Sequence, residues 1–355
     1  MRGAPPHSSA GAKPPAIALP TRPENGGDPG AVGARVFAAA RGVRAGVDSR
    51  RASLIGLLLF CVASAMLIAV NGVMLSRDLI FLWVLVGLLA VSAADVRGWA
   101  RGVIYDWLPF FAALFAYDLL RGLAGSHPLF DPHVMPQIRA DEVLFGGSVP
   151  TVSLQERFYD VGQIHPWDLA AWAVYLTHFV VVFAIAAALW RLARPSFLRF
   201  RAMVLTLTAA AFVTYVVFPA APPWMASDDG VIGPVNRVVA TVWNGIGIDH
   251  AAAIWERGSA FANEVAAIPS LHTAYPVLIL CFFWSRGGWA RAACSAYALA
   301  MSLTLVYTGE HYVIDILLGW AYAIATYAAV GRFAAWRAAA KRVSAADPAP
   351  ASSSY

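Results

Sequence analysis

Residues 168–190 read DLAAWAVYLTHFVVVFAIAAALW, a run whose single charged side chain is Asp168 at its start. A helix needs about 20 apolar residues to cross the hydrocarbon core of a bilayer, so this stretch is long enough to span one. Of the 355 residues, 59% are hydrophobic and 13% are charged, and the mean hydropathy is +0.61. Soluble domains carry roughly 25% charged residues. The composition excludes a water-soluble globular enzyme and predicts an all-α, polytopic bundle of transmembrane helices.

Eight apolar segments of this kind lie along the chain, so we expect about eight spans. Their approximate bounds are 53–74, 79–94, 103–122, 168–190, 202–219, 271–286, 289–308 and 312–333. The second and the sixth are short for a full crossing. Residues 1–50 and 338–355 are rich in Pro, Gly, Ala and Ser without a sustained apolar pattern, which predicts disordered tails on either side of a membrane domain at 51–337.

Lys and Arg are distributed unevenly over the loops between these segments. Twenty of the 26 fall on the two tails and the turns of one side, although the other side holds both long loops, 123–167 and 220–270. Positive charge is retained in the cytoplasm. We therefore expect a multi-pass protein of the plasma (inner) membrane with both termini in the cytoplasm. The basic residues do not gather on one solvated surface, which argues against a nucleic-acid partner.

Two polar motifs stand where later spans begin. Residues 269–276 read PSLHTAYP, and residues 309–315 read GEHYVID. Ionisable groups at membrane depth are costly unless they face a protein interior or a wet cavity, so these residues are functional candidates. By the expected topology both motifs lie at the extracytoplasmic rim. The three cysteines, in contrast, lie within apolar segments and favour neither disulfides nor a thiolate metal site.

The residue types in the two motifs suit phosphoryl transfer. Asp315 follows His311 by four residues, which places both side chains on one face of a helix. The carboxylate can hold one ring nitrogen and raise the basicity of the other, so that the imidazole attacks phosphorus. Ser270 is a candidate N-cap at a helix start that suits phosphate, and His272 can protonate the leaving oxygen. This chemistry proceeds through a phosphohistidine and calls for no metal or cofactor.

Together the motifs resemble the second and third signatures of the type-2 phosphatidic acid phosphatase superfamily of membrane lipid phosphatases and phosphotransferases. The matching residues are Pro-Ser-Leu-His at 269–272 and His-Tyr-x-x-Asp-x-x-x-Gly at 311–319. Leu271, where phosphatases usually have glycine, and the stretch FPAAPPW at 218–224 resemble the inositol phosphorylceramide synthase branch. The resemblance covers about residues 200–330.

What the resemblance implies is a six-helix core inside a catalytic membrane domain. It implies that His311 is the nucleophile, that Asp315 orients it, and that His272 is the general acid. All three would face away from the cytoplasm.

The chain departs from the phosphatase pattern at its phosphate-binding positions. Thr304 and Leu305 stand where the third motif usually carries Ser-Arg, and the pair Arg194-Pro195 falls on a predicted cytoplasmic turn. Phosphate binding is therefore expected to come from other cations. The candidates are Arg121, with Asp118 one turn before it, and the loop residues Arg139, Arg237 and Arg257.

Several of these residues have a structural interpretation beside the functional one. Further candidates for substrate binding are Ser270, Trp224, Tyr275, Glu310 and His178. Trp224 is alternatively an interfacial anchor, Arg121 a side chain that snorkels to the interface, and His178 a buried mid-span histidine. Glu310 is either a solvated rim charge or a partner for an acceptor hydroxyl. The segment 150–158 is predicted to be amphipathic and to lie at the outer interface.

The sequence favours a phosphotransferase that acts on phospholipid head groups, with inositol phosphate as the group transferred by resemblance. One alternative is a phosphatase for lipid or polyprenyl phosphates that uses the same two histidines and aspartate with water as acceptor. A second alternative is a lipid-binding membrane module without activity. In each case the lipid bilayer and a phospholipid or polyprenyl phosphate are the partners, and the sequence indicates no oligomeric state.

Overall fold

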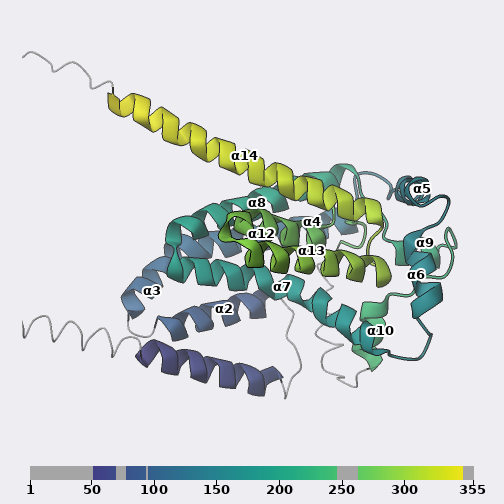
Figure 1. The fold of residues 1–355 in the computed structure, drawn as a ribbon, viewed down its shortest axis with the longest axis horizontal. Coiled ribbons are helices and arrows are strands. Elements are labelled where there is room, and N and C mark those ends of the chain that lie inside the picture. The colour runs from purple at the N-terminus through teal and green to yellow at the C-terminus, as the bar shows by residue number, and fades with distance from the viewer. Residues whose placement is uncertain (1–50, 69–76, 93–94, 246–262, 347–355) are drawn as a thin grey trace, which may run out of the picture. The chain divides into compact units, whose positions relative to one another are not determined.

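The structure, a computed structural model, describes residues 51–68, 77–92, 95–245 and 263–346 (Figure 1). Within them six helices are long and apolar enough to cross a membrane: Arg51–Ile68, Val96–Ser126, Pro166–Leu192 (α7), Arg194–Val217 (α8), Gly288–Tyr307 (α13) and Val313–Arg342 within α14. The prediction of an all-α, polytopic helical bundle is confirmed. The expected tail at 1–50 lies outside the described residues.

Other helices are shorter. They are α2 (Arg77–Val91), α3 (Val96–Gly102), α4 (Leu108–Ser126), α5 (Met135–Leu144), α6 (Pro150–Phe158), α9 (Pro223–Asp228), α10 (Val238–Gly245) and α12 (Leu271–Phe283). A π-helical turn at Val103–Trp107 joins α3 to α4. The second and sixth predicted spans are α2 and α12, of 15 and 13 residues. Neither has the length of a full crossing.

The last helix is longer than predicted. α14 runs from Val313 to Ala346, past the expected end of the span at 333 and into the segment predicted as a tail from 338. Ten of the 13 added residues, 334–346, are Ala, Arg or Lys, which are strong helix formers. Local propensity therefore continues the helix beyond the apolar stretch, and only residues 347–355 of the expected tail lie outside the described part.

α12 is the central short helix and packs against both α13 and α14. The approach to α14 is close at Gly319, where an added Cβ would lie 2.5 Å from the carbonyl oxygen of Ser270 and 2.7 Å from Oγ1 of Thr273. Glycine at this position thus allows the two motif-bearing segments to meet. Around α4, α7 and α8 the core is aromatic, with Trp107, Phe110, Phe111, Phe197 and Phe200 buried in one cluster.

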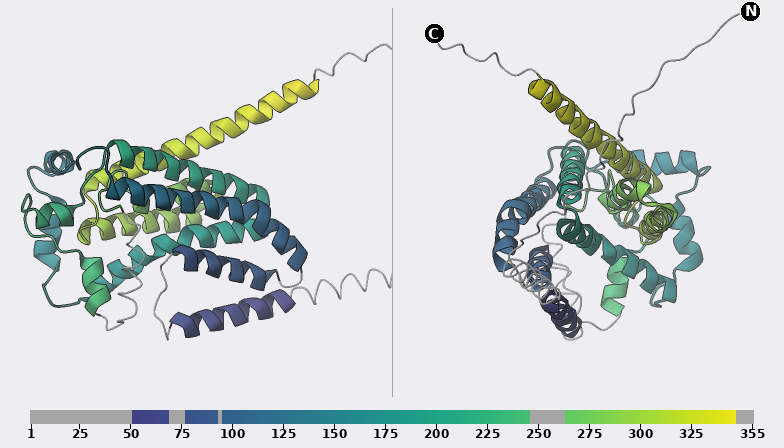
Figure 2. Two further views of the ribbon diagram at one scale, coloured as in Figure 1. Left: turned by 180° about the vertical axis from the view of Figure 1, so that it is seen from behind. Right: turned by 60° about the vertical axis from the view of Figure 1, so that its left-hand side comes forward.

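The helices α5, α6, α9 and α10 gather at one end of the bundle, at the right in Figure 1, and the opposite view in Figure 2 agrees. α6, the segment expected at the membrane interface, packs on protein through Gln155, which is buried. Its side-chain amide donates to the carbonyls of Asn236 and Tyr307 at 2.8 Å each, and its oxygen accepts the N–H of Asn236 at 2.7 Å. α6 therefore clamps the loop before α10 onto the end of α13.

Candidate active site

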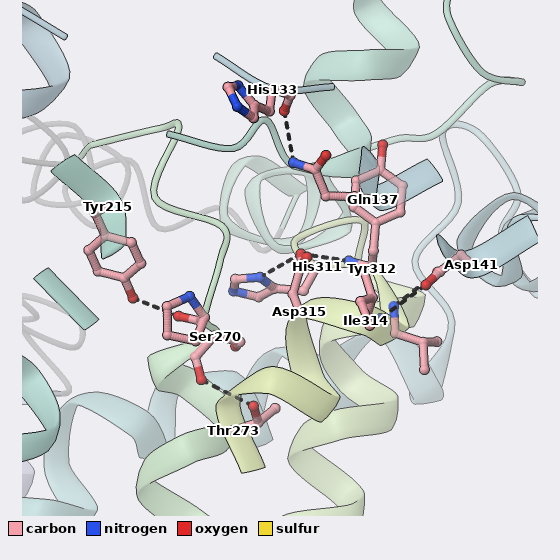
Figure 3. Close-up of polar contacts among 12 residues, drawn as sticks. His133, Gln137, Asp141, Tyr215, Ser270, Thr273, His311, Tyr312, Ile314 and Asp315 are labelled. Carbon is pink, nitrogen blue, oxygen red and sulfur yellow. Dashed lines mark hydrogen bonds and ion pairs between the residues drawn. The ribbon is translucent and has the colours of Figure 1, made fainter. Parts of the chain in front are cut away.

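His311 and Asp315 meet at the start of α14. Nδ1 of His311 lies 3.3 Å from Oδ2 of Asp315, and both side chains are buried (Figure 3). The predicted contact is present, although His311 precedes the helix, which begins at Val313. Asp315 stands at the third helical position and also accepts the N–H of Tyr312 at 3.0 Å, as an acidic residue does in a capping box. With Nδ1 held in this way, Nε2 is the nitrogen left for chemistry.

His272 faces His311 from the first turn of α12. The two ring centroids are 5.6 Å apart with planes inclined by 57°. On its other sides the His272 ring stacks on Tyr175 at 5.1 Å and lies 4.0 Å from His178, both on α7. Nε2 of His272 is buried with no hydrogen-bond partner among the described residues. Three helices therefore bring two imidazoles within reach of one small group.

The turn before α12 is tied directly to α14. Ser270 is the N-cap residue, as predicted, but its hydroxyl makes no capping hydrogen bond and is buried without a partner in the described part of the chain. Its backbone N–H donates instead to the carbonyl of Asp315 at 3.1 Å. Tyr215 on α8 donates its hydroxyl proton to the carbonyl of Pro269 at 2.8 Å. The position of Ser270 is thus set by hydrogen bonds to the backbone of residues 269 and 270.

Glu310 is not a solvated rim charge. Its side chain is 8% exposed, and its two carboxylate oxygens accept hydrogen bonds from Nε and Nη2 of Arg237 at 2.8 and 3.2 Å. The guanidinium carbon of Arg237 also lies 4.9 Å from the centroid of the Trp224 ring. Burial acts to lower the pKa of Arg237, but the charge and hydrogen bonds of Glu310 raise it overall, so this cation stays charged next to His311.

A second cation approaches from α4. Arg121 interacts electrostatically with Asp118, as expected from their spacing, and its guanidinium lies 5.7 Å from the Tyr117 ring. Both Arg121 and Arg237 are close enough to interact electrostatically with His272. Two guanidinium groups therefore lie within electrostatic range of His272. Arg139 is exposed on α5, Arg257 lies outside the described residues, and Arg194 is at the opposite end of α8.

Two predicted binding residues prove to be neighbours of His272 rather than separate subsites. The His178 ring lies between His272 and Tyr275, 5.5 Å from the latter. The hydroxyl of Tyr275 is hydrogen bonded to Oγ1 of Thr208 on α8 at 2.6 Å. These contacts restrict the orientation of His272. Sequence reasoning missed Tyr175, although it lies three residues before His178 and thus on the same face of an otherwise apolar helix.

The segment 218–224 has a structural role that its composition did not reveal. Ala220 is fully buried; its N–H donates to Val265, and its carbonyl accepts from Ala267, in the strand-like stretch that leads to α12. The N–H of Trp224 donates to the carbonyl of Gly309 at 3.2 Å. Gly309 adopts a left-handed conformation (φ 80°), and a side chain there would meet Asn236. One short segment thus supports both motifs, and the ring of half-buried Trp224 contacts Arg237.

Within the described residues no three His, Cys, Asp or Glu side chains form a group able to hold a metal ion. What gathers instead is a pair of imidazoles, a buried carboxylate and two guanidinium groups. Nucleophile, proton donor and anion-binding cations are the parts required for transfer of a phosphoryl group.

Comparison with known proteins agrees with this chemistry. A family profile described as the PAP2 superfamily matches residues 151–329, which include both motifs. A Bacteroides thetaiotaomicron protein, phosphoinositol dihydroceramide synthase, is 31% identical over 223 residues, which cover 60% of this chain and 71% of that protein. No solved structure matches the chain. The chain therefore belongs to the PAP2 superfamily and is a membrane enzyme that acts on lipid phosphate groups.

Proposed function

We propose that the chain transfers inositol phosphate from a phospholipid to an acceptor lipid through a phosphohistidine at His311. The single observation that carries the proposal is the facing of the two histidines, whose ring centroids are 5.6 Å apart, with Asp315 at Nδ1 of His311 so that Nε2 is left for attack. The similarity to a phosphoinositol dihydroceramide synthase favours inositol phosphate as the group and a ceramide-type hydroxyl as the acceptor.

In the first step, Nε2 of His311 attacks the phosphorus of the donor. The bond from phosphorus to the diacylglycerol oxygen breaks, and His272, which enters this step as the imidazolium, gives that oxygen its proton and becomes neutral. Inositol phosphate is then held on His311, and the imidazolium character of the ring is stabilised by Asp315. Arg121 and Arg237 bind the non-bridging oxygens, whose charge they offset in the transition state.

In the second step, the acceptor hydroxyl loses its proton to His272, and its oxygen attacks the phosphorus. The bond between phosphorus and Nε2 of His311 breaks, which restores both histidines to their starting states. The same site hydrolyses the intermediate if water takes the place of the acceptor. Exclusion of water therefore separates a transferase from a phosphatase here.

We also propose an orientation in the membrane, which rests on the distribution of Lys and Arg. Twenty of the 26 Lys and Arg residues fall on one side of the predicted spans, which favours cytoplasmic termini and a site open to the extracytoplasmic leaflet. We also propose that transfer needs no metal ion, because the histidines and guanidinium groups supply nucleophile, acid and charge stabilisation between them.

The test uses purified full-length protein in lipid nanodiscs with phosphatidylinositol labelled in the inositol ring. We expect a labelled new lipid that forms only when ceramide is added and persists in EDTA. His311→Ala should be inert, whereas His127→Ala, an exposed histidine after α4, should match wild type. Acceptor-independent release of inositol phosphate would instead assign a hydrolase, and an inert wild type that still binds lipid would assign a non-catalytic module.

A further inference from the structure

Asp141 on α5 lies beside the start of the helix that carries Asp315. Asp141 is fully buried, and each of its carboxylate oxygens accepts one backbone hydrogen bond. The N–H of Val313 donates to Oδ2 and the N–H of Ile314 donates to Oδ1, both at 3.0 Å (Figure 3). A loop helix more than 170 residues earlier in the chain thus caps the first turn of α14.

A helix start requires such partners, because its first four N–H groups have no intrahelical acceptor. At α14 three successive groups are held by two carboxylates: Tyr312 by Asp315, and Val313 and Ile314 by Asp141. Negative charge is also favourable at the positive end of the helix dipole. The start of α14 is therefore fully capped only when both Asp141 and Asp315 accept these hydrogen bonds.

Apolar packing reinforces the same contact. The Tyr312 ring is fully buried in a cluster with Ile138, which lies one turn before Asp141 on α5, and with Val149 and Ala226. α5 therefore contacts residues 312–314 in two ways: Asp141 accepts their backbone hydrogen bonds, and Ile138 packs with the Tyr312 ring. These residues connect His311 to Asp315, so any displacement of them changes the distance between the imidazole and its carboxylate.

We infer that Asp141 is a positioning residue for the His311–Asp315 pair, which it holds in register through the first turn of α14. The inference rests on the proposed phosphohistidine chemistry for its effect on rate, but the positioning itself is a property of the fold. Asp141 touches no reacting atom. It acts through the backbone between the two site residues.

The two backbone hydrogen bonds favour the ionised form of Asp141. Burial raises the pKa of Asp141, and the hydrogen bonds from Val313 and Ile314 oppose that rise. The carboxylates of Asp141 and Asp315 repel each other, so Asp141 supports Asp315 through the backbone of the cap and not by direct attraction. Replacement by Asn keeps the shape of the side chain, but its NH2 group cannot accept from a backbone N–H, so one of the two caps is lost.

The experiment compares Asp141→Asn with Glu142→Gln, which removes the neighbouring carboxylate on the same helix. We expect Asp141→Asn to lower kcat about tenfold to a hundredfold with KM nearly unchanged, because the defect lies in the nucleophile and not in substrate binding. Amide hydrogen exchange at residues 312–316 should rise in the same variant. Glu142→Gln should change neither quantity.

Wild-type kcat and wild-type exchange at 312–316 in Asp141→Asn would overturn the inference. So would exchange that rises equally throughout the bundle, because that indicates general destabilisation. If Asp141→Asn fails to fold, Asp141→Ser, whose hydroxyl can accept one N–H, must show the same selective loss, and a matched rise in KM there would also overturn it. If wild type shows no activity, the proposed function fails but the inference does not, because amide hydrogen exchange at residues 312–316 still tests whether Asp141 holds the cap.

Discussion

Two buried aspartates, Asp106 and Asp315, stand at opposite ends of the bundle and differ in how completely they are bonded. Both oxygens of Asp106 accept hydrogen bonds from Arg194 at 2.9 Å, and Oδ2 also accepts from Trp190. Oδ2 of Asp315 contacts His311 and Tyr312, while its Oδ1 is buried with no partner among the described residues. The two carboxylates are both nearly inaccessible to solvent.

We interpret the difference as that between a structural ion pair and the candidate active site. At the Asp106 end, charge is neutralised by a cation from the same chain, and the Arg201 guanidinium adds a bond to the Asp106 carbonyl at 2.7 Å. Near Asp315, buried polar atoms of Ser270 and His272 also lack hydrogen-bond partners among the described residues. Unsatisfied buried polar groups are costly, so these three beside His311 call for a functional reason.

The largest expected effect comes from Asp315→Asn. Loss of the carboxylate leaves the His311 ring with the wrong tautomer or orientation, and we expect kcat to fall about 10³- to 10⁴-fold by analogy with the aspartate of a catalytic triad. Single-turnover formation of labelled phosphohistidine is the measurement. A thermal midpoint close to wild type is expected alongside it. A variant that keeps its turnover would remove the distinction drawn between the two aspartates.

Arg237→Lys should have a smaller effect. Lysine keeps the charge but loses the two-point contact with Glu310 and the planar stacking on Trp224. We expect KM for the donor lipid to rise about tenfold, with a smaller fall in kcat. Arg139→Lys, an exposed residue on α5, is the matched control and should behave as wild type. Equal kinetics for both variants would show that Arg237 does not bind phosphate.

The smallest effect on activity is expected from Asp106→Asn. The substitution weakens the contacts with Arg194 and Trp190 and should lower stability by about 1–3 kcal/mol, with the lower part favoured because the Arg194 side chain is 60% exposed. Thermal unfolding in detergent measures this loss. Specific activity of the folded fraction should remain at the wild-type level, since ~30 Å of helix separates Arg194 from Tyr215 at the site end of α8. A selective fall in kcat would contradict the assignment.

Spans and motifs were accessible to sequence reasoning because their signals are local. Apolar length predicted the helices, and the spacing of His311 and Asp315 predicted their contact even though the helix begins after His311. Other predictions depended on what lies nearby in space. Nothing in the sequence around Glu310 or Trp224 indicates that Arg237 lies between them, since that contact joins three separate segments.

By itself the sequence determined that this is a helical membrane protein, and it predicted phosphorus chemistry from two histidines and an aspartate, because hydrophobic length and short-range spacing are properties of neighbouring residues. The tertiary structure decided which cations approach the histidines, which loop supports both motifs, and that Asp141 caps α14. Those contacts join residues far apart in the chain. They arise only when packing brings the helix ends together and their backbone groups must find partners.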